Sequence, residues 1–312
     1  MVALPVVMLA VSLGVFLLAA ASPFEPLVGY LGDRYLTMSQ QDQARIAEQL
    51  GMNQPWPAQY LQWLGHLIQG DLGTSRVFGR PVSEVLAQRL PWTLLLSGVA
   101  MVMALVASLI LATWAARRQN GLVDRVVTGM ATLVQGVPPF VVALVFVTVL
   151  GVALQVLPVG GLTDPGAEVT PAGVARHLVQ PALVLAVSQM PWLVLHLRQS
   201  LLAALSEDHV RGARARGIGE WTVLLRHALP TALLPFATVA GSRVAELVAG
   251  TVIVEEVFSW PGVAQAVVAS AMEVDFPLLA ALALLATVAV LLGSLLADVS
   301  YAALDPRVGT DG

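Results

Sequence analysis

The chain has 312 residues, 57% of them hydrophobic and only 12% charged, and its mean hydropathy is +0.79. These values predict a membrane protein, because several spans of about 20 residues account for the length better than two soluble domains do. There is no cysteine, the net charge is −4, and every basic residue is Arg. This composition excludes a disulfide framework, a thiolate metal cluster, a lysine-containing phosphate loop and a basic nucleic-acid surface. If transport runs on ATP, another chain must hydrolyse it.

Six stretches are apolar enough and long enough to cross a hydrocarbon layer about 30 Å thick. They are residues 4–21, 92–116, 126–156, 178–197, 231–254 and 278–297. The third is expected to bend or break at Pro138-Pro139, and the fourth, which holds several polar residues, to be buried among other helices. For the first stretch the alternative is a cleaved signal peptide. That alternative is disfavoured because the apolar run exceeds an h-region and no basic residue precedes it.

The Arg residues identify the cytoplasmic side. An even number of spans places both termini on one side of the membrane. The connections 117–125 and 198–226 hold three and five Arg residues, whereas the connections 157–177 and 255–277 hold only Arg176. Under the positive-inside rule the Arg-rich connections and both termini are cytoplasmic.

The long connection between the first two spans predicts a small helical cap outside the cytoplasm. Residues 39–42 form a capping-box variant that opens a helix, which Gly51 would stop. Pro57 opens a second helix, and Pro81 precedes a third over Val82–Leu90. The apolar face of the second helix consists of Tyr60, Trp63, Leu64, Leu67 and Ile68.

Between spans four and five, residues 206–230 predict a polar helix, a glycine-containing turn and an amphipathic helix that ends at Pro230, where span five must start. Its Arg residues are expected to face water or anionic headgroups, and Val223, Leu224 and Ala228 to face apolar neighbours. Composition alone fits an ordinary juxtamembrane basic segment that binds acidic lipid.

The spacing within this segment resembles the loop motif of permease subunits of bacterial ABC importers, E-A-A-x3-G-x9-I-x-L-P. Aligning Gly217 on the motif glycine also matches Ala213, Leu229 and Pro230, while Arg211, Gly212 and His227 depart from the motif. These departures resemble the dipeptide/oligopeptide/nickel branch, which reads roughly D-Y-V-R-x-A-R-A-K-G and then L-L-R-H-A-L. The corresponding residues here are 208–217 and 224–229.

The resemblance covers almost the full chain in ordered blocks. The further blocks are Leu50-Gly51 through residues 70–75, residues 79–84, Glu255 through Pro261-Gly262, Asp275-Phe276-Pro277, and Leu304 through Arg307. The N-terminus departs from the family, whose members usually begin with a basic stretch and follow span one with a P-G-D-P-like turn. This chain starts with Val2-Ala3-Leu4 and has residues 22–26, SPFEP, after the span.

The resemblance implies an all-α membrane protein with six transmembrane helices in the type I ABC importer permease arrangement. The first transmembrane helix is then residues 1–21, and an extracytoplasmic helical cap, residues 22–91, follows between helices 1 and 2. Residues 92–304 form a five-helix core with a cytoplasmic coupling loop at 200–230, and residues 305–312 form a cytoplasmic tail. The implied location is the bacterial plasma (inner) membrane.

In this family the loop forms a coupling helix that sits in a groove on a cytoplasmic ATPase. Gly217 would allow a close backbone approach or a sharp turn. The residues to which the resemblance assigns ATPase coupling are Asp208, Arg211, Ala213, Arg214, Arg216, Gly217, Leu229 and Pro230.

Three pairs of residues are candidates for the translocation path or its gate. Arg243 and Glu246 lie on one face of the fifth span, where they either line the path or neutralise each other to fix helix packing. Pro138 and Pro139 either expose backbone to the path or only kink the helix, and the kink is the simpler interpretation. Glu255 and Glu256 form either an outer gate or binding-protein dock, or a solvated helix end.

The implied partners are a second homologous permease, two ATPase subunits or domains, an extracytoplasmic solute-binding protein and the lipid bilayer, with no nucleic acid. The chain is expected to be no enzyme, with no catalytic residue, metal or cofactor of its own, and ATP with Mg would bind the partner ATPase. Short peptides are the expected cargo, with nickel, a metal-chelator complex or haem as alternatives. An ion-coupled secondary transporter is a rival class, but it usually has more ionisable groups at mid-membrane. An intramembrane hydrolase is disfavoured because no H-E-x-x-H or G-x-S-x-G occurs.

Overall fold

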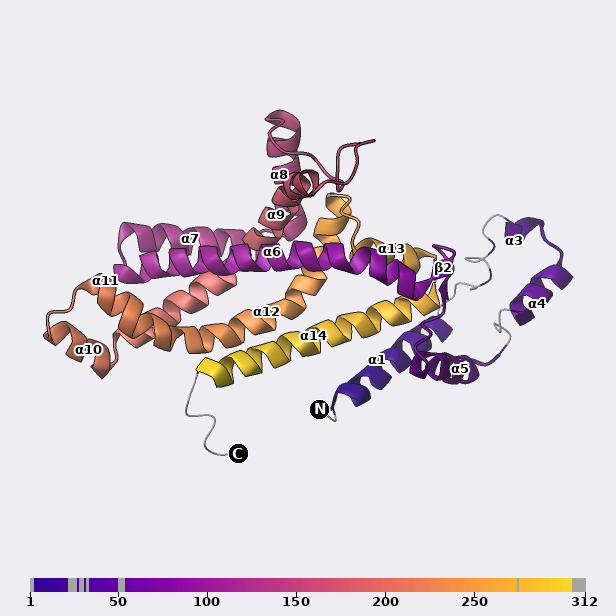
Figure 1. The fold of residues 1–312 in the computed structure, drawn as a ribbon, viewed down its shortest axis with the longest axis horizontal. Helices are drawn as coiled ribbons and strands as arrows, with labels where there is room; N and C mark the ends of the chain where they lie inside the picture. The colour runs from indigo at the N-terminus through magenta and orange to yellow at the C-terminus, as the bar shows by residue number, and fades with distance from the viewer. Residues whose placement is uncertain are drawn as a thin grey trace. The chain divides into compact units, whose positions relative to one another are not determined.

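The structure is a computed structural model that describes residues 3–21, 27, 31, 34–49, 54–273 and 275–304. Apart from one two-stranded ribbon, the regular elements of these residues are helical (Figure 1). The chain divides into two compact units. One comprises Met1–Thr93 with Pro261–Ala289, and the other Leu94–Trp260 with Val290–Gly312.

The first unit contains four N-terminal helices, the ribbon, α13 and the adjoining parts of two long helices. Its elements are α1 (Ala3–Ala20), α3 (Arg34–Thr37), α4 (Gln40–Gln49), α5 (Trp56–Ile68), β1 (Thr74–Ser75), β2 (Arg80–Pro81), the start of α6 (Val82–Arg117), α13 (Val263–Met272) and the start of α14 (Phe276–Leu304). The strands are antiparallel, with Thr74 opposite Pro81 and Ser75 opposite Arg80.

The amphipathic face predicted for α5 packs against the uncharged helix α1. The ring of Phe16 lies 5.2 Å from that of Tyr60 and 5.3 Å from that of Trp63, and the hydroxyls of Ser12 and Tyr60 are 3.1 Å apart. Ile68 was predicted on the same face, but it is 80% exposed because it is the last residue of the helix.

The predicted helix starts in this unit are nearly correct. α4 begins at Gln40, and the hydroxyl of Ser39 accepts the Asp42 N–H at 3.2 Å, so the predicted cap is confirmed. Gly51, the predicted stop, lies outside the described residues. α5 begins at Trp56, one residue before Pro57.

The separate third cap helix over Val82–Leu90 is wrong. A helix does begin at Val82, but α6 continues without interruption to Arg117, through Pro91 and through the residue 91/92 boundary drawn from the sequence. A proline removes one backbone hydrogen bond, and a long apolar helix packed in a protein can tolerate that loss.

The second unit contains the rest of α6 and α14 with all the elements between them except α13. These are α7 (Leu122–Gln135), α8 (Pro139–Phe146), the π-helical segment η1 (Val147–Ala153), α9 (Pro171–Leu205), α10 (Asp208–Ala215), α11 (Glu220–Thr222), the π-helical segment η2 (Val223–Ala228) and α12 (Leu229–Val257). Helix α9 packs against α7, α8 and α12, which agrees with the prediction that this span is buried among other helices, although its His196 is exposed. Gln180 and Gln189 are both buried.

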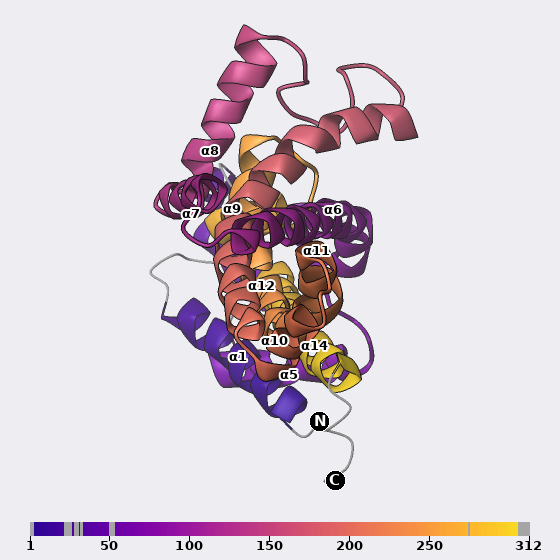
Figure 2. The same ribbon diagram turned by 90° about the vertical axis from the view of Figure 1, so that its left-hand side faces the viewer.

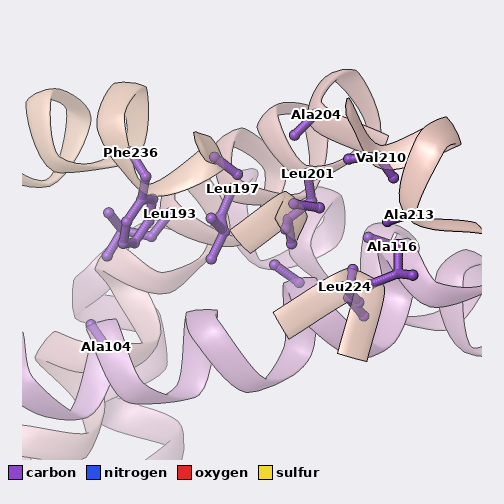
Figure 3. Close-up of a cluster of buried hydrophobic side chains, with 14 of the residues drawn as sticks. Ala104, Ala116, Leu193, Leu197, Leu201, Ala204, Val210, Ala213, Leu224 and Phe236 are labelled. Carbon is purple, nitrogen blue, oxygen red and sulfur yellow. The ribbon is translucent and has the colours of Figure 1, made fainter. Parts of the chain in front are cut away.

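The core of this unit is a cluster of small and branched apolar side chains (Figure 3). Helix α9 contributes Leu193, Leu197 and Leu201, which recur every four residues and therefore share one face. Phe236 of α12 packs into the same cluster.

Four described helical segments are long and apolar enough to cross a membrane, or five when α7 and α8–η1 count as one broken span. The four are Val82–Arg117, Pro171–Leu205, Glu220–Val244 and Phe276–Leu295. The remaining stretch predicted from the sequence, residues 4–21, corresponds to α1, whose apolar segment Pro5–Leu18 is shorter than a full span.

Candidate functional site

The segment of residues 206–228, called the hairpin segment below, connects α9 to α12 at one end of both helices (Figure 1). Its apolar side chains are buried in the core cluster. Val210 and Ala213 of α10 are fully buried, as are Val223 and Ala228 of η2, and Leu224 is almost so. Figure 3 shows Val210, Ala213 and Leu224 in the same cluster as Leu197 and Leu201. The predicted apolar face of Val223, Leu224 and Ala228 is confirmed.

The charged side chains of the hairpin segment lie at its surface. The side chains of Asp208 and Arg211 are 98% and 70% exposed and form a loose ion pair at 3.5 Å. Arg216 is also exposed. Arg214 is exposed, as predicted, and it also donates from Nε and Nη2 to the two carboxylate oxygens of Glu220, at 2.9 and 3.1 Å. This bidentate pair joins α10 to α11 across the turn.

Gly217 forms that turn in the left-handed region, with φ +77°. Its N–H donates to the Arg214 carbonyl at 2.9 Å, and the next N–H, of Ile218, donates to the Ala213 carbonyl at 3.3 Å. A Cβ at residue 217 would meet no described atom of this chain within 4 Å. Of the two roles expected for Gly217, the structure therefore supports the sharp turn, since close packing within the chain does not require it.

Leu229 and Pro230 do not end a helix, contrary to prediction. The π-helical segment η2 runs directly into α12, whose first residues are Leu229 and Pro230. Proline is tolerated in the first turn because its missing N–H is needed least there, and a π-helical turn already changes the hydrogen-bond register.

A second neighbour holds the hairpin segment in place. The guanidinium of Arg117, the last residue of α6, lies 4.5 Å from the ring centroid of Trp221. A depression of about 280 Å³ lies beside this contact. Its lining includes Arg117, Gln119, Ser206, Arg214, Glu220 and Leu224.

The path candidates fall in different environments. Arg243 is 9% exposed, and its guanidinium lies 4.5 Å from the ring centroid of Trp192 on α9. The side chain of its predicted partner Glu246 lies outside the described residues. Glu255 is fully buried, whereas Glu256 is exposed. A solvated helix end therefore describes Glu256 but not Glu255.

Pro138 and Pro139 lie at a complete break in the third span. Helix α7 ends at Gln135 and α8 begins at Pro139, and the two helical parts meet at 104°. Figure 2 shows α8 leaving the end of α7 at this steep angle. The predicted bend or break is confirmed.

In the first unit, one carboxylate joins two sequence blocks that are 200 residues apart. Asp275 is fully buried, and its Oδ2 accepts from the Ser75 hydroxyl at 2.6 Å and from the N–H groups of Arg76 and Val77 at 2.8 and 3.1 Å. Its Oδ1 caps α14 by accepting the Leu278 N–H at 3.4 Å. Both blocks belong to the family resemblance, but nothing in the sequence pairs them with each other. The helix-start pattern at Asp275-Phe276-Pro277 was the available signal.

The turn before β1 has its own carboxylate. Asp71 accepts the Gly73 N–H at 2.8 Å and lies 3.2 Å from Nδ1 of His66. These two contacts, the first being the stronger, hold the pKa of Asp71 below its ordinary value.

Comparison with known proteins identifies the family. The profile described as "Binding-protein-dependent transport system inner membrane component" matches residues 84–310. The chain belongs to this family. It is a permease subunit and not an enzyme, and the family name implies an inner-membrane location and a separate binding protein, while ABC transport implies an ATPase partner.

Curated relatives cover nearly the whole permease. It is 36% identical to the oligopeptide transport system permease protein AppB of Bacillus subtilis over 97% of this chain and 95% of that protein. It is 38% identical to OppB of Mycobacterium tuberculosis over 84% of this chain and 83% of that protein. It is 34% identical to the probable D,D-dipeptide transport system permease protein DdpB of Escherichia coli over 95% of this chain and 92% of that protein.

A solved structure supports the fold. The crystal structure of an amino acid ABC transporter with histidines matches the permease with a TM-score of 0.53 at 17% identity, over 70% of this chain and 94% of that one.

Proposed function

We propose that the permease is the transmembrane subunit of an ATP-driven importer of short peptides and forms half of the translocation path. The relatives that match almost its full length are named for oligopeptide or D,D-dipeptide transport. In this proposal six helices span the inner membrane, both termini are cytoplasmic and residues 22–91 lie outside. A second homologous permease, two ATPase subunits or domains and a solute-binding protein complete the importer. ATP and Mg²⁺ bind the ATPases.

The observation that carries this proposal is the division of the hairpin segment into an apolar inner face and a charged outer face. The inner face is packed into the cluster formed by α9 and α12, so a force applied to α10 moves those helices. The outer residues can contact a partner without unpacking the core. The proposed coupling residues are Asp208, Arg211, Ala213, Arg214, Arg216, Gly217, Leu229 and Pro230.

The proposed path and outer gate draw on three places in the second unit. The Pro138-Pro139 break supplies a bend at which backbone can line a path. Arg243 and Glu246 supply charge within a span, and Glu255 and Glu256 follow at the end of α12. Inverting an inward-open to outward-open ratio from 1:99 to 99:1 requires about 5.5 kcal/mol of differential binding, which nucleotide and the loaded binding protein supply together.

The first test is co-purification followed by transport. The permease expressed with its neighbouring genes is expected to be isolated with ATPase subunits and a second permease. In vesicles the complex should take up labelled di- to pentapeptides only when ATP is present on the ATPase side. Uptake of nickel, a metal chelate or haem in place of peptide would show that the proposed cargo is wrong. Uptake by the permease alone would show that the proposed ATP-driven importer is wrong.

A glycine substitution tests the coupling role. Gly217→Val forces a β-branched residue into the left-handed region, whereas Gly217→Asn is the matched control, because Asn tolerates that conformation. The Val variant is expected to assemble and to hydrolyse ATP without uptake, while the Asn variant retains most uptake. Equal coupling in both variants would reject the role of this turn.

A further inference from the structure

A buried ion pair joins the start of α7 to α9 in the second unit. Asp124 is 2% exposed, and its two carboxylate oxygens accept from Nε and Nη2 of Arg198, the latter at 2.7 Å. The side chain of Arg198 is 18% exposed. Removing Arg198 would leave a buried carboxylate without its cationic partner.

The same carboxylate fixes the turn between α6 and α7. Oδ2 of Asp124 also accepts the N–H of Asn120 at 2.7 Å, and Asn120 has a φ of +62°. The turn is tight as well, since a Cβ at Gly121 would lie 2.9 Å from the Arg118 carbonyl oxygen. A single side chain therefore holds the connection 118–121, the first turn of α7 and Arg198 together.

Through α9, these contacts connect the hairpin segment to α7, which is not its neighbour in sequence. Helix α9 leads directly into α10, and its Leu197 and Leu201 flank Arg198 within the cluster that buries Val210 and Ala213. At its other end α7 stops at the break before Pro139. The ion pair therefore holds the start of α7, while its end is not continuous with α8.

Burial of this pair is not explained by stability alone. Replacing a buried ion pair by apolar groups of similar volume is often neutral or stabilising, and in some proteins buried polar groups are retained because they fix one arrangement of the helices. The relative position of α7 and α9 would need such specificity if the two helices move together in each transport cycle.

We propose that Asp124 and Arg198 are positioning residues that make α7 move as one body with α9 and the hairpin segment, so that the third span flexes at the Pro138-Pro139 break. This inference rests on the proposed function, because it assigns the pair a task in the transport cycle. It adds a second route, independent of the apolar cluster, by which motion of the hairpin segment reaches the membrane helices.

The first experiment replaces the pair in the assembled importer. The double variant Asp124→Asn/Arg198→Met has no unpaired charge, leaves an acceptor oxygen for the Asn120 N–H, and is expected to assemble with an unchanged thermal midpoint. The number of peptides transported per ATP hydrolysed should nevertheless fall about tenfold, within the range seen when residues along a coupling route are changed. The single variant Asp124→Asn, which leaves Arg198 without its anionic partner, should lower the thermal midpoint.

A structural role would give a different pattern. If the double variant recovers both the thermal midpoint and the transport stoichiometry, the positioning role is overturned and the pair only fixes packing. If the unsubstituted complex shows no ATP-dependent uptake, the proposed function fails, which is distinguishable from failure of this inference.

The second experiment measures the motion with the native pair present. Because the sequence contains no cysteine, spin labels can be placed at Thr132→Cys and Gln199→Cys, both exposed positions on α7 and α9. Their separation should be the same with and without trapped nucleotide. A matched pair at Thr132→Cys and Phe140→Cys, across the break, should change. A change between α7 and α9 as large as that across the break would overturn the proposal.

Discussion

The hairpin segment and the ribbon of the first unit are both short connections, but different interactions hold them in place. The hairpin segment buries Val210 and Ala213 and leaves Asp208 and Arg211 at the surface. The ribbon is instead held by one buried carboxylate, Asp275, whose two oxygens accept from four donors of the same unit.

The difference shows which connection is built to be engaged by another molecule. Charges at the surface of a firmly packed helix remain free to pair with a partner, and their loss costs little stability. A fully satisfied buried charge offers nothing to a partner, and its loss is expensive. Substitutions in the two regions should therefore separate stability from transport, and four of them follow in order of decreasing effect on stability.

Asp275→Leu should have the largest effect, about 4 kcal/mol of local stability, since the Ser75 hydroxyl and the N–H groups of Arg76 and Val77 lose their acceptor. Limited trypsin digestion should then cleave after Arg76 much faster than in the unsubstituted protein. Asp275→Asn retains one acceptor oxygen, so its cleavage rate should lie between those of the Leu variant and the unsubstituted protein. Unchanged cleavage in the Leu variant would show that the carboxylate does not hold the ribbon.

Val210→Ala should destabilise the hairpin segment by about 2 kcal/mol, because it removes two buried methyl groups from a packed cluster. The thermal midpoint of the detergent-solubilised importer reports this loss. Gly212→Ala is the control, because a Cβ at residue 212 would contact no described atom within 4 Å. A midpoint as high as that of the control would mean that packing is not what anchors α10.

Arg214→Ala should cost only about 0.5 kcal/mol, because the pair with Glu220 is largely exposed and screened by solvent. The companion variant Glu220→Ala and the double variant complete a thermodynamic cycle of thermal midpoints. A coupling energy above about 2 kcal/mol would show that this pair stabilises the fold strongly, as Asp275 is expected to do, and is not a weak surface ion pair.

Arg211→Ala should leave the thermal midpoint of the isolated permease unchanged, because this side chain is 70% exposed. It should nevertheless weaken recovery of the ATPase with the permease at moderate salt, which co-purification and light scattering can measure. Arg45→Ala in α4 is the matched control, since it removes an exposed charge from the first unit. Equal ATPase recovery in both variants would remove Arg211 from the proposed contact.

Local sequence patterns predicted much of this architecture. Apolar runs predicted the long helices, the double proline predicted the break at residue 138, Ser39 predicted the cap of α4, and three-residue and four-residue spacing predicted the face of α5 that packs against α1. Each of these depends on residues that are neighbours in sequence, so composition and period are sufficient.

Long-range polar contacts were missed for a physical reason. Asp124 and Arg198 are 74 residues apart, and Ser75 and Asp275 are 200 apart. Taken singly, each charged residue looks like a solvated end of a helix. Likewise, no local pattern reveals that α6 continues through Pro91 and joins the predicted helix 82–90 to the predicted span 92–116.

The broken third span bears on how the chain enters the bilayer during synthesis. Helix α7 has 14 residues and α8 with η1 covers Pro139–Ala153, so each half is about 21 to 23 Å long at 1.5 Å per residue, too short to cross about 30 Å of hydrocarbon by itself. The translocon must therefore release the two halves together or alongside a neighbouring segment. An algorithm that counts hydrophobic peaks and splits or skips this pair will invert the assigned sidedness of every loop that follows.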